Sequence, residues 1–274
     1  MLLFILSLFF ISVDAYQKLI NSRIVLLPGY GCCKNDYVEF QQICNHMNIP
    51  LDIVEIQRWE WLKVTKGIMN PNYWNYNCMP NELFDWYLEK TKNTLFSSFE
   101  KNKHHPVIVC GHSAGGWLGR FLLNNGTLYG EETRSKDYVK ALVTMGTPNQ
   151  FLLKKENDTT RGCLQYVHEH FPNSYLQEEG IKYMTLGSRV KKINLQENLN
   201  WKEKMVRNSY LTVVDKHQYD EIWGDGVVPY DACHLERAKQ VTFDDVYHFQ
   251  RKNKKWYWEE SILKHWLYEL EKII

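Results

Sequence analysis

Short apolar runs alternate with helix-like stretches along most of the 274-residue chain. Several runs are continuously apolar and rich in β-branched residues, which is typical of strands covered on both faces. The runs span residues 23–27, 51–56, 107–110, 141–145, 183–186 and 240–243. Helical patterns occupy residues 36–47, 81–101, 115–123 and 259–273. This alternation predicts an α/β fold, a mainly parallel sheet with helices on both faces.

Two long segments interrupt the alternation. Residues 59–80 are aromatic and polar, and residues 147–180 are mostly polar. Connections of this length without regular structure are uncommon in compact domains unless they serve a function. We therefore expect each segment to be a lid-like insertion or to line a pocket, with an ordinary surface excursion as the alternative.

The first fifteen residues, MLLFILSLFFISVDA, are typical of a secretory signal peptide. Their apolar run is shorter than a bilayer span, so an uncleaved anchor, like a buried strand, is the weaker alternative. Removal of this peptide would leave residues 16–274 as a single domain. We expect entry into the secretory or endomembrane pathway, followed by secretion or by routing to a plastid-like organelle.

The balance of charges argues against one class of partner, nucleic acid. Lys and Arg number 33 against 32 Asp and Glu, so the chain lacks the broad positive field that attracts nucleic acid.

Seven cysteines would leave at least one unpaired thiol in an oxidising compartment, and Cys110 in its apolar run is our candidate. No C-x-x-C pair occurs, and His168 and His170 lack a third ligand, so we expect neither metal nor cofactor. Sequons at Asn125 and Asn157 predict a glycoprotein if the chain is secreted.

The stretch VIVCGHSAGGWLGR, residues 107–120, places Ser113 between Gly111 and Gly115 at the end of a predicted strand. A sharp strand-to-helix turn forces its central residue into a strained, exposed conformation, and flanking glycines remove side chains that would collide. The pattern predicts a nucleophilic serine, with a plain glycine-rich turn as the alternative. The amide of Ala114, at the start of the helix, would stabilise developing negative charge.

A nucleophilic serine needs a base, an acid that orients the base, and a second oxyanion donor. In LPGYG, residues 27–31, Gly29 permits close backbone approach and the Tyr30 amide is the expected donor. Asp225 is the expected acid because glycines flank it in GDGVVP, and His248 is the expected base because it follows the last predicted strand. The rivals in the sequence are Asp215, Asp220 and Asp231 for the acid, and His217 and His234 for the base.

Together these motifs resemble the α/β-hydrolase superfamily in its lipase-like branches, most of all plant and cyanobacterial (plastid-type) hydrolases that carry LPGxG and GHSAGGW. The resemblance rests on LPGYGCCKNDY, VIVCGHSAGGWLGR, LVTMGTPN, GDGVVP, and VYHF followed by WYW. It implies an α/β-hydrolase fold with a lid-like insertion and a serine esterase or lipase whose triad is Ser113, Asp225 and His248. Residues expected to contact substrate are Gly29, His112, Trp117 and Pro148, although Trp117 could instead pack under the sheet.

The expected substrate is a carboxylic ester, especially of a lipid, and transient contact with a membrane surface would accompany its hydrolysis. Two alternatives stay open. A thioesterase that removes acyl groups from proteins uses the same machinery, and a binding protein without catalysis could retain the fold. Residues 59–80 and 188–223 match no pattern within the resemblance, so substrate selection is open as well.

Overall fold

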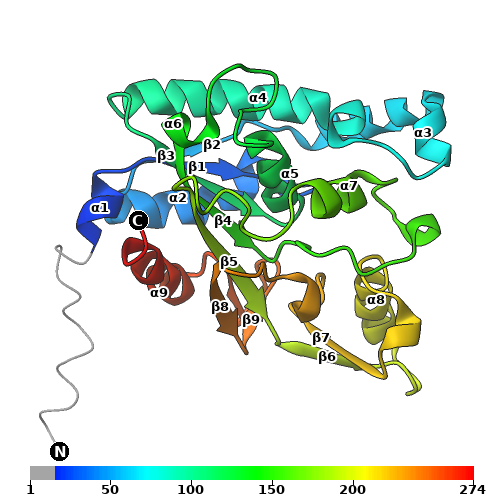
Figure 1. Cartoon of the computed structure of the whole chain (residues 1–274). Helices are drawn as coiled ribbons and strands as arrows, with labels where there is room; N and C mark the ends of the chain where they lie inside the picture. The colour runs from blue at the N-terminus through cyan, green and yellow to red at the C-terminus, as the bar shows by residue number, and fades with distance from the viewer. Residues whose placement is uncertain (1–15) are drawn as a thin grey trace, which may run out of the picture.

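A computed structural model describes residues 16–274 (Figure 1), so the predicted signal peptide at residues 1–15 lies outside the described part. All six apolar runs form strands, and these pair in parallel in the order β2-β1-β3-β4-β5-β8. Their bounds are β1 Ile24–Leu27, β2 Leu51–Ile53, β3 Val107–His112, β4 Val139–Met145, β5 Lys182–Ser188 and β8 Lys239–Phe243. The predicted parallel sheet is therefore confirmed.

Helices cover both faces of this sheet (Figure 1). The helices are α1 Gln17–Ile20, α2 Val38–His46, α3 Pro71–Trp74, α4 Pro80–Lys101, α5 Ala114–Leu123, α6 Ser135–Tyr138, α7 Cys163–His170, α8 Trp201–Tyr210 and α9 Glu260–Glu271. Alternate residues of each central strand enter opposite apolar clusters: Val25 packs with α4 and α5, whereas Ile24 packs with α2 and α9. Burial on both faces explains the continuously apolar sequence of these strands.

The strand register brings three loops to one edge of the sheet. Leu27 at the end of β1 lies opposite Gly111, and His112 at the end of β3 lies opposite Met145 at the end of β4. The segments that follow these strands therefore begin side by side at the carboxyl edge. Open α/β sheets bind their ligands at this edge.

A two-stranded antiparallel sheet and a third apolar cluster accompany the predicted sheet. Strands β6 Lys191–Asn194 and β7 Glu221–Gly224 form this small sheet, and α8, which lies between them in the sequence, packs on it. The two-residue strands β9 Val246–Tyr247 and β10 Lys255–Trp256 form a further short pair. Most of the β6–α8–β7 region falls in residues 188–223, which matched no sequence pattern.

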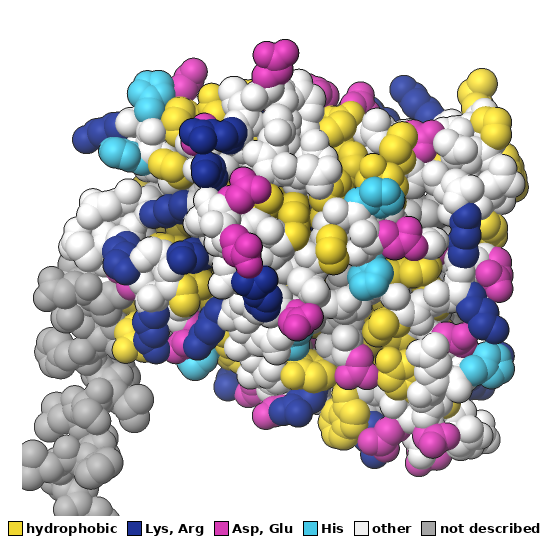
Figure 2. Space-filling model, viewed as in Figure 1, with side chains coloured by type: hydrophobic (Ala, Val, Ile, Leu, Met, Phe, Trp, Pro, Cys, Tyr) yellow, Lys and Arg dark blue, Asp and Glu magenta, His cyan; other side chains and the backbone are white. Residues whose placement is uncertain are grey.

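The aromatic and polar segment of residues 59–80, called the aromatic insertion below, contains more regular structure than its sequence pattern indicates. Residues 58–74 form the 3₁₀ helix η4 Arg58–Met69 and the short helix α3. Several large apolar side chains of this segment are exposed: Trp59, Leu62, Ile68, Met69 and Trp74. Figure 2 shows hydrophobic side chains at the end of the molecule where α3 lies and elsewhere on that face, interspersed with charges of both signs. The remaining 3₁₀ helices are η3 Lys34–Tyr37, η5 Lys155–Asn157, η6 Lys216–Gln218 and η7 Tyr230–Ala232.

All seven cysteines, Cys110 included, are buried free thiols. Both sequon asparagines, Asn125 and Asn157, are exposed. Within residues 16–274, no helix combines the length and the apolar character that a membrane crossing requires.

Candidate active site

Ser113 occupies the turn between β3 and α5 in a strained conformation, with φ 52° and ψ −123°. A non-glycine residue in such a conformation costs on the order of 1–3 kcal/mol and persists only where its surroundings hold it. Here the Ser113 amide donates to the Met145 carbonyl at 2.9 Å, and the Thr147 hydroxyl donates to the Ser113 carbonyl at 3.0 Å. A Cβ on Gly111 would lie 2.4 Å from the Gly116 Cα, so this turn requires its glycines, as the motif predicts.

A buried ion-pair geometry joins Asp225 and His248. The His248 Nδ1 atom lies 2.7 Å from Asp225 Oδ2, and both side chains are almost wholly excluded from solvent. Asp225 directly follows β7, and His248 directly follows β9. The other carboxylate oxygen, Oδ1, accepts hydrogen bonds from two backbone amides of its own turn, those of Val227 at 2.9 Å and Val228 at 2.8 Å. The carboxylate is thereby held in one orientation toward the imidazole.

Tyr257 provides a further donor to the acid, a role that sequence reasoning missed. Its hydroxyl donates to Asp225 Oδ2 at 3.0 Å. Burial raises the pKa of Tyr257 well above its usual value, with the Asp225 charge adding to the effect, so the phenol keeps the proton that it donates. The WYW motif at residues 256–258 marked the residue but carried no sign of its partner, which lies 32 positions away.

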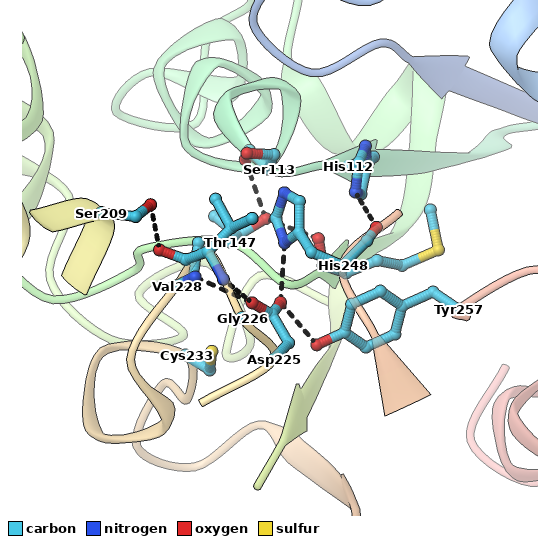
Figure 3. A network of polar contacts seen from close by, with 12 residues as sticks. His112, Ser113, Thr147, Ser209, Asp225, Gly226, Val228, Cys233, His248 and Tyr257 are labelled. Atoms are coloured by element: carbon cyan, nitrogen blue, oxygen red, sulfur yellow. Dashed lines mark hydrogen bonds and ion pairs between the residues drawn. The ribbon is translucent and has the colours of Figure 1, made fainter. Parts of the chain in front are cut away.

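The His248 ring lies between Ser113 and Asp225 in Figure 3. Because the Asp225 carboxylate accepts a hydrogen bond from Nδ1, a neutral His248 keeps its lone pair on Nε2. This Nε2 atom is buried and has no hydrogen-bond partner within residues 16–274. Catalytic hydrogen bonds are often long or poorly aligned in ligand-free proteins and tighten in the complex with substrate.

The Gly-Thr-Pro turn after β4 packs directly on the Asp225–His248 pair. Gly146 has φ 52°, and a Cβ there would lie 2.7 Å from Asp225 Oδ2 and 2.9 Å from His248 Nδ1. Only glycine therefore fits without displacing the pair. Pro148, which we expected to contact substrate, is buried in the same turn.

The loop after β1 lies against the serine. A Cβ on Gly29 would lie 3.0 Å from the Ser113 Cβ, which places this loop within reach of groups bound at Ser113. The Tyr30 amide follows in the loop, and the Ala114 amide begins α5; neither donates to another described residue. The Tyr30 ring is exposed and lies 5.0 Å from the Trp61 ring, so this loop adjoins the aromatic insertion.

His112 is wholly buried and belongs to a chain of hydrogen bonds. Burial, reinforced by the neighbouring His248, holds the pKa of His112 well below its usual value, so the ring is neutral. Its Nε2 lies 3.2 Å from the His248 carbonyl, which can only accept, so Nε2 carries the proton. Nδ1 therefore accepts from the Tyr37 hydroxyl at 2.9 Å, and that hydroxyl accepts from the Gly29 amide at 2.9 Å.

Two residues expected to contact substrate lie instead in the interior. His112 is 0% exposed and points into the chain just described, and Trp117 is 2% exposed and packs edge-on against Phe84 in the core under the sheet. The placement of Trp117 is the packing alternative that its sequence left open. Both side chains are therefore parts of the described interior, and their predicted contact with substrate stays a prediction.

The rival acids and bases either form hydrogen bonds with other residues or are exposed to solvent. Asp215 accepts a hydrogen bond from the His217 amide and so caps η6. His234 lies 2.8 Å from the Thr185 hydroxyl through Nδ1, and burial lowers its pKa to about 4. Asp220 and Asp231 are exposed. Across residues 16–274, no cluster of three or more His, Cys, Asp and Glu side chains is arranged to hold a metal.

Comparison with solved structures identifies the fold. The chain superposes on the crystal structure of the Bacillus licheniformis lipase BlEst2 in its mature form with a TM-score of 0.55 and 13% identity, over 91% of each chain. EstA from Clostridium botulinum matches at a TM-score of 0.42 and 12% identity, over 92% of this chain and 87% of its own. Mouse alpha/beta hydrolase domain-containing protein 10 matches at 0.38 and 13%, over 91% and 88%. No family model and no curated protein sequence matches the chain. The superposition on BlEst2, together with the parallel sheet and its covering helices, shows that the chain has the α/β-hydrolase fold.

Proposed function

We propose that this protein is a serine hydrolase that cleaves carboxylic esters, with Ser113, Asp225 and His248 as its triad. One observation carries the proposal: a buried Asp225 carboxylate orients His248 so that its Nε2, which has no hydrogen-bond partner within residues 16–274, faces the strained turn that presents Ser113. A nucleophile, a base and an oriented acid in this order are what acyl transfer through serine requires.

In the proposed mechanism, His248 Nε2 takes the proton of Ser113 as Oγ attacks the ester carbonyl. The Tyr30 and Ala114 amides bind the oxyanion that develops on the carbonyl oxygen. The imidazolium, stabilised by Asp225, then gives its proton to the leaving alcohol as the ester bond breaks. Water, deprotonated by His248, attacks the acyl-serine and releases the carboxylic acid.

Exposed apolar side chains beside the site favour a lipid ester. Met69 is 91% exposed, Leu62 69% and Trp59 64%, all on η4, which adjoins the Tyr30 loop through Trp61. Contiguous exposed apolar surface marks sites for membranes, ligands or proteins. We propose that this segment touches the surface of a lipid aggregate while a lipid is presented to Ser113.

A fluorophosphonate probe tests the proposed nucleophile. Ser113 Oγ of the wild-type protein is expected to displace fluoride from phosphorus and become labelled, whereas Ser113→Ala protein stays unlabelled. The same variant should lose at least about 10³-fold in p-nitrophenyl ester hydrolysis with an unchanged thermal melt. His248→Ala should lose activity similarly, and the matched control His234→Ala should retain it. Labelling of Ser113→Ala at the wild-type rate would exclude the triad.

The lipid preference is tested by comparing the hydrolysis of an emulsified long-chain ester with that of a soluble short-chain ester. Replacing Trp59 and Met69 by serine is expected to lower hydrolysis of an emulsified long-chain ester while hydrolysis of a soluble butyrate ester changes little. Equal losses on both substrates would contradict contact of η4 with a lipid surface.

A further inference from the structure

A cavity of about 650 Å³ adjoins the segment that follows the proposed base, and Ser113, Asp225 and His248 are not among the residues that line it. Its walls come from the Tyr30 loop, from η3 and α2, and from the segment that follows His248. Phe249 forms part of the wall, and its ring lies 4.6 Å from the His248 ring. The volume lies within the usual range of ligand sites and exceeds what a glycerol unit or one sugar ring requires.

The position of the cavity assigns it to the alcohol half of an ester. In acyl transfer the leaving oxygen receives its proton from the Nε2 atom of the base, so the alcohol lies on the side of the base. Phe249 and Gln250, the two residues after His248, both line this cavity. An alcohol that accepts a proton from His248 would therefore occupy this space.

Residues with hydrogen-bonding side chains line the cavity. Asn35, Gln42 and Gln250 are among them, and the amide of each offers both donors and an acceptor. Trp258, which is 2% exposed, also forms part of the wall, and its buried Nε1 has no acceptor within residues 16–274. The side chains that carry hydrogen-bonding groups into this wall are therefore mostly uncharged.

The charges of the cavity do not favour an anionic ligand. Arg58 is its one cation among the lining residues, and it forms an ion pair with Asp36 and also donates to the Gly31 carbonyl at 3.0 Å. Glu39, a further lining carboxylate, accepts from the Trp256 Nε1 at 3.1 Å. With the arginine already neutralised, a phosphate in this space would meet the Glu39 carboxylate without a free cation to balance it.

We propose that this cavity binds the alcohol half of the substrate and selects an uncharged polyhydroxylated alcohol, such as a sugar or a glycerol unit. The proposal rests on the proposed ester hydrolysis at Ser113. The acyl carbon–oxygen bond to the polyol breaks, the polyol leaves with a proton from His248, and the acyl group passes through Ser113 to water. Hydroxyl groups suit the cavity because each can both donate to and accept from the side-chain amides of Asn35, Gln42 and Gln250.

The test compares laurate esters that differ only in the alcohol. The wild-type protein is assayed on 6-O-lauroylglucose, 1-monolauroylglycerol, 1-lauroylglycerol-3-phosphate, ethyl laurate and p-nitrophenyl laurate. We expect kcat/KM for the glucose or glycerol ester to exceed that for ethyl laurate by at least about tenfold, because a site built for hydroxyls discriminates against an alcohol that lacks them. The phosphate-bearing ester should be cleaved more slowly than monolauroylglycerol.

Two variants connect that preference to the cavity. Gln42→Leu and Gln250→Leu are each expected to reduce the polyol-to-ethyl ratio of kcat/KM severalfold. Gln196→Leu is the matched control, since Gln196 is an exposed glutamine between β6 and α8, outside the residues that line the cavity, and its ratio should equal that of the wild type.

The outcomes separate this inference from the proposed function. Hydrolysis of p-nitrophenyl laurate without any polyol preference, or with preference for the phosphate-bearing ester, overturns this inference and leaves the proposed function standing. A polyol preference that persists in both cavity variants also overturns it. Hydrolysis of none of the five esters overturns the proposed function, and this inference falls with it.

Discussion

His112 Nε2 lies 3.2 Å from the backbone carbonyl oxygen of His248, and this contact joins β3, the strand that precedes Ser113, to the segment that carries the proposed base. The Nδ1 atom of the neutral His112 ring accepts a hydrogen bond from the Tyr37 hydroxyl, and that hydroxyl accepts one from the Gly29 amide. The proposed oxyanion loop, the nucleophile strand and the proposed base are therefore held by one buried chain of hydrogen bonds. Such chains orient the groups that act on a substrate.

Tyr37→Phe should lower kcat more than it changes KM. The variant removes the hydroxyl that links these hydrogen bonds, and it leaves the Gly29 amide and His112 Nδ1 without this partner. Because the loop and the base then lose their mutual support, we expect kcat to fall by about 10-fold to 100-fold, the range for misplaced catalytic groups. Steady-state kinetics on a soluble ester provide the measurement.

The control for this variant is Tyr175→Phe. Tyr175 also has a buried hydroxyl, which donates to the Arg120 and Asn124 carbonyls near the end of α5. We expect it to lower the melting temperature by a similar amount and to leave kcat near the wild-type value. An equal fall of kcat in both variants would reduce the Tyr37 chain to a structural role.

Tyr257→Phe tests the additional donor to Asp225. Hydrogen bonds to charged groups contribute about 1.5–3 kcal/mol, and the loss would fall on a carboxylate that orients His248. We expect kcat/KM for ester hydrolysis to fall by about 10-fold, with the protein still folded by circular dichroism. Wild-type kinetics in a folded variant would show that the two backbone amides at Oδ1 are sufficient.

Gly146→Ala should disable the site through a single methyl group. The added carbon would meet Asp225 Oδ2 and His248 Nδ1 at 2.7 and 2.9 Å, so the pair must separate or shift. We expect activity to fall by at least about 10²-fold, as for misplacements of about 1 Å. Gly180→Ala is the control, because Gly180 also has a positive φ, 106°, but a Cβ there meets nothing within 4 Å. Its activity should be retained despite a modest loss of stability.

The free energy of unfolding should decrease as pH falls below about 6.5. Burial lowers the pKa of His234 to about 4 and lowers those of His112 and His168 as well. Above pH 6.5 these groups are neutral in both states and have no effect. Below it, the unfolded chain binds protons that the folded chain does not, at a cost of at most about 1.4 kcal/mol per pH unit for each histidine.

Urea unfolding between pH 7.5 and 5 measures this dependence. His234→Gln should make it shallower, because one of the depressed groups is removed, whereas replacement of the exposed His46 should not alter it. A free energy of unfolding that stays constant over this interval would contradict the buried, neutral state of these rings.

The sheet could be predicted because its central strands β1 and β3 are buried at every residue and are almost uninterruptedly apolar. The β6–β7 pair could not be predicted, since Lys191–Asn194 contains one buried residue and has the composition of a polar loop. The 3₁₀ helix η4 escaped prediction for a related reason: much of its apolar surface faces solvent, so its pattern lacks the one-sided periodicity of a packed helix.

Within the site, local motifs were informative and long-range partners were not. The glycine spacing around Ser113 predicted its turn, and the order of motifs predicted the proximity of Asp225 and His248 that the structure contains; their catalytic roles stay a prediction. The contribution of Tyr37 could not be inferred, because its hydroxyl meets His112 across 75 positions of sequence. His112 and Trp117 were expected at the substrate, with packing under the sheet as the alternative for Trp117, yet β3 and α5 direct both into the interior.

The turn that carries the acid of the proposed triad is held by the smallest of the three apolar clusters found in residues 16–274. Asp225 follows strand β7. The Ser209 hydroxyl of α8 donates to the Val227 carbonyl at 2.8 Å, and the Tyr210 hydroxyl of α8 accepts from the Gly226 amide at 3.0 Å. Local opening of a small cooperative unit requires less free energy than global unfolding. Under mild denaturing stress we therefore expect β6, β7 and α8 to open first, so that the proposed catalysis fails by release of the acid while the parallel sheet and the serine turn remain intact.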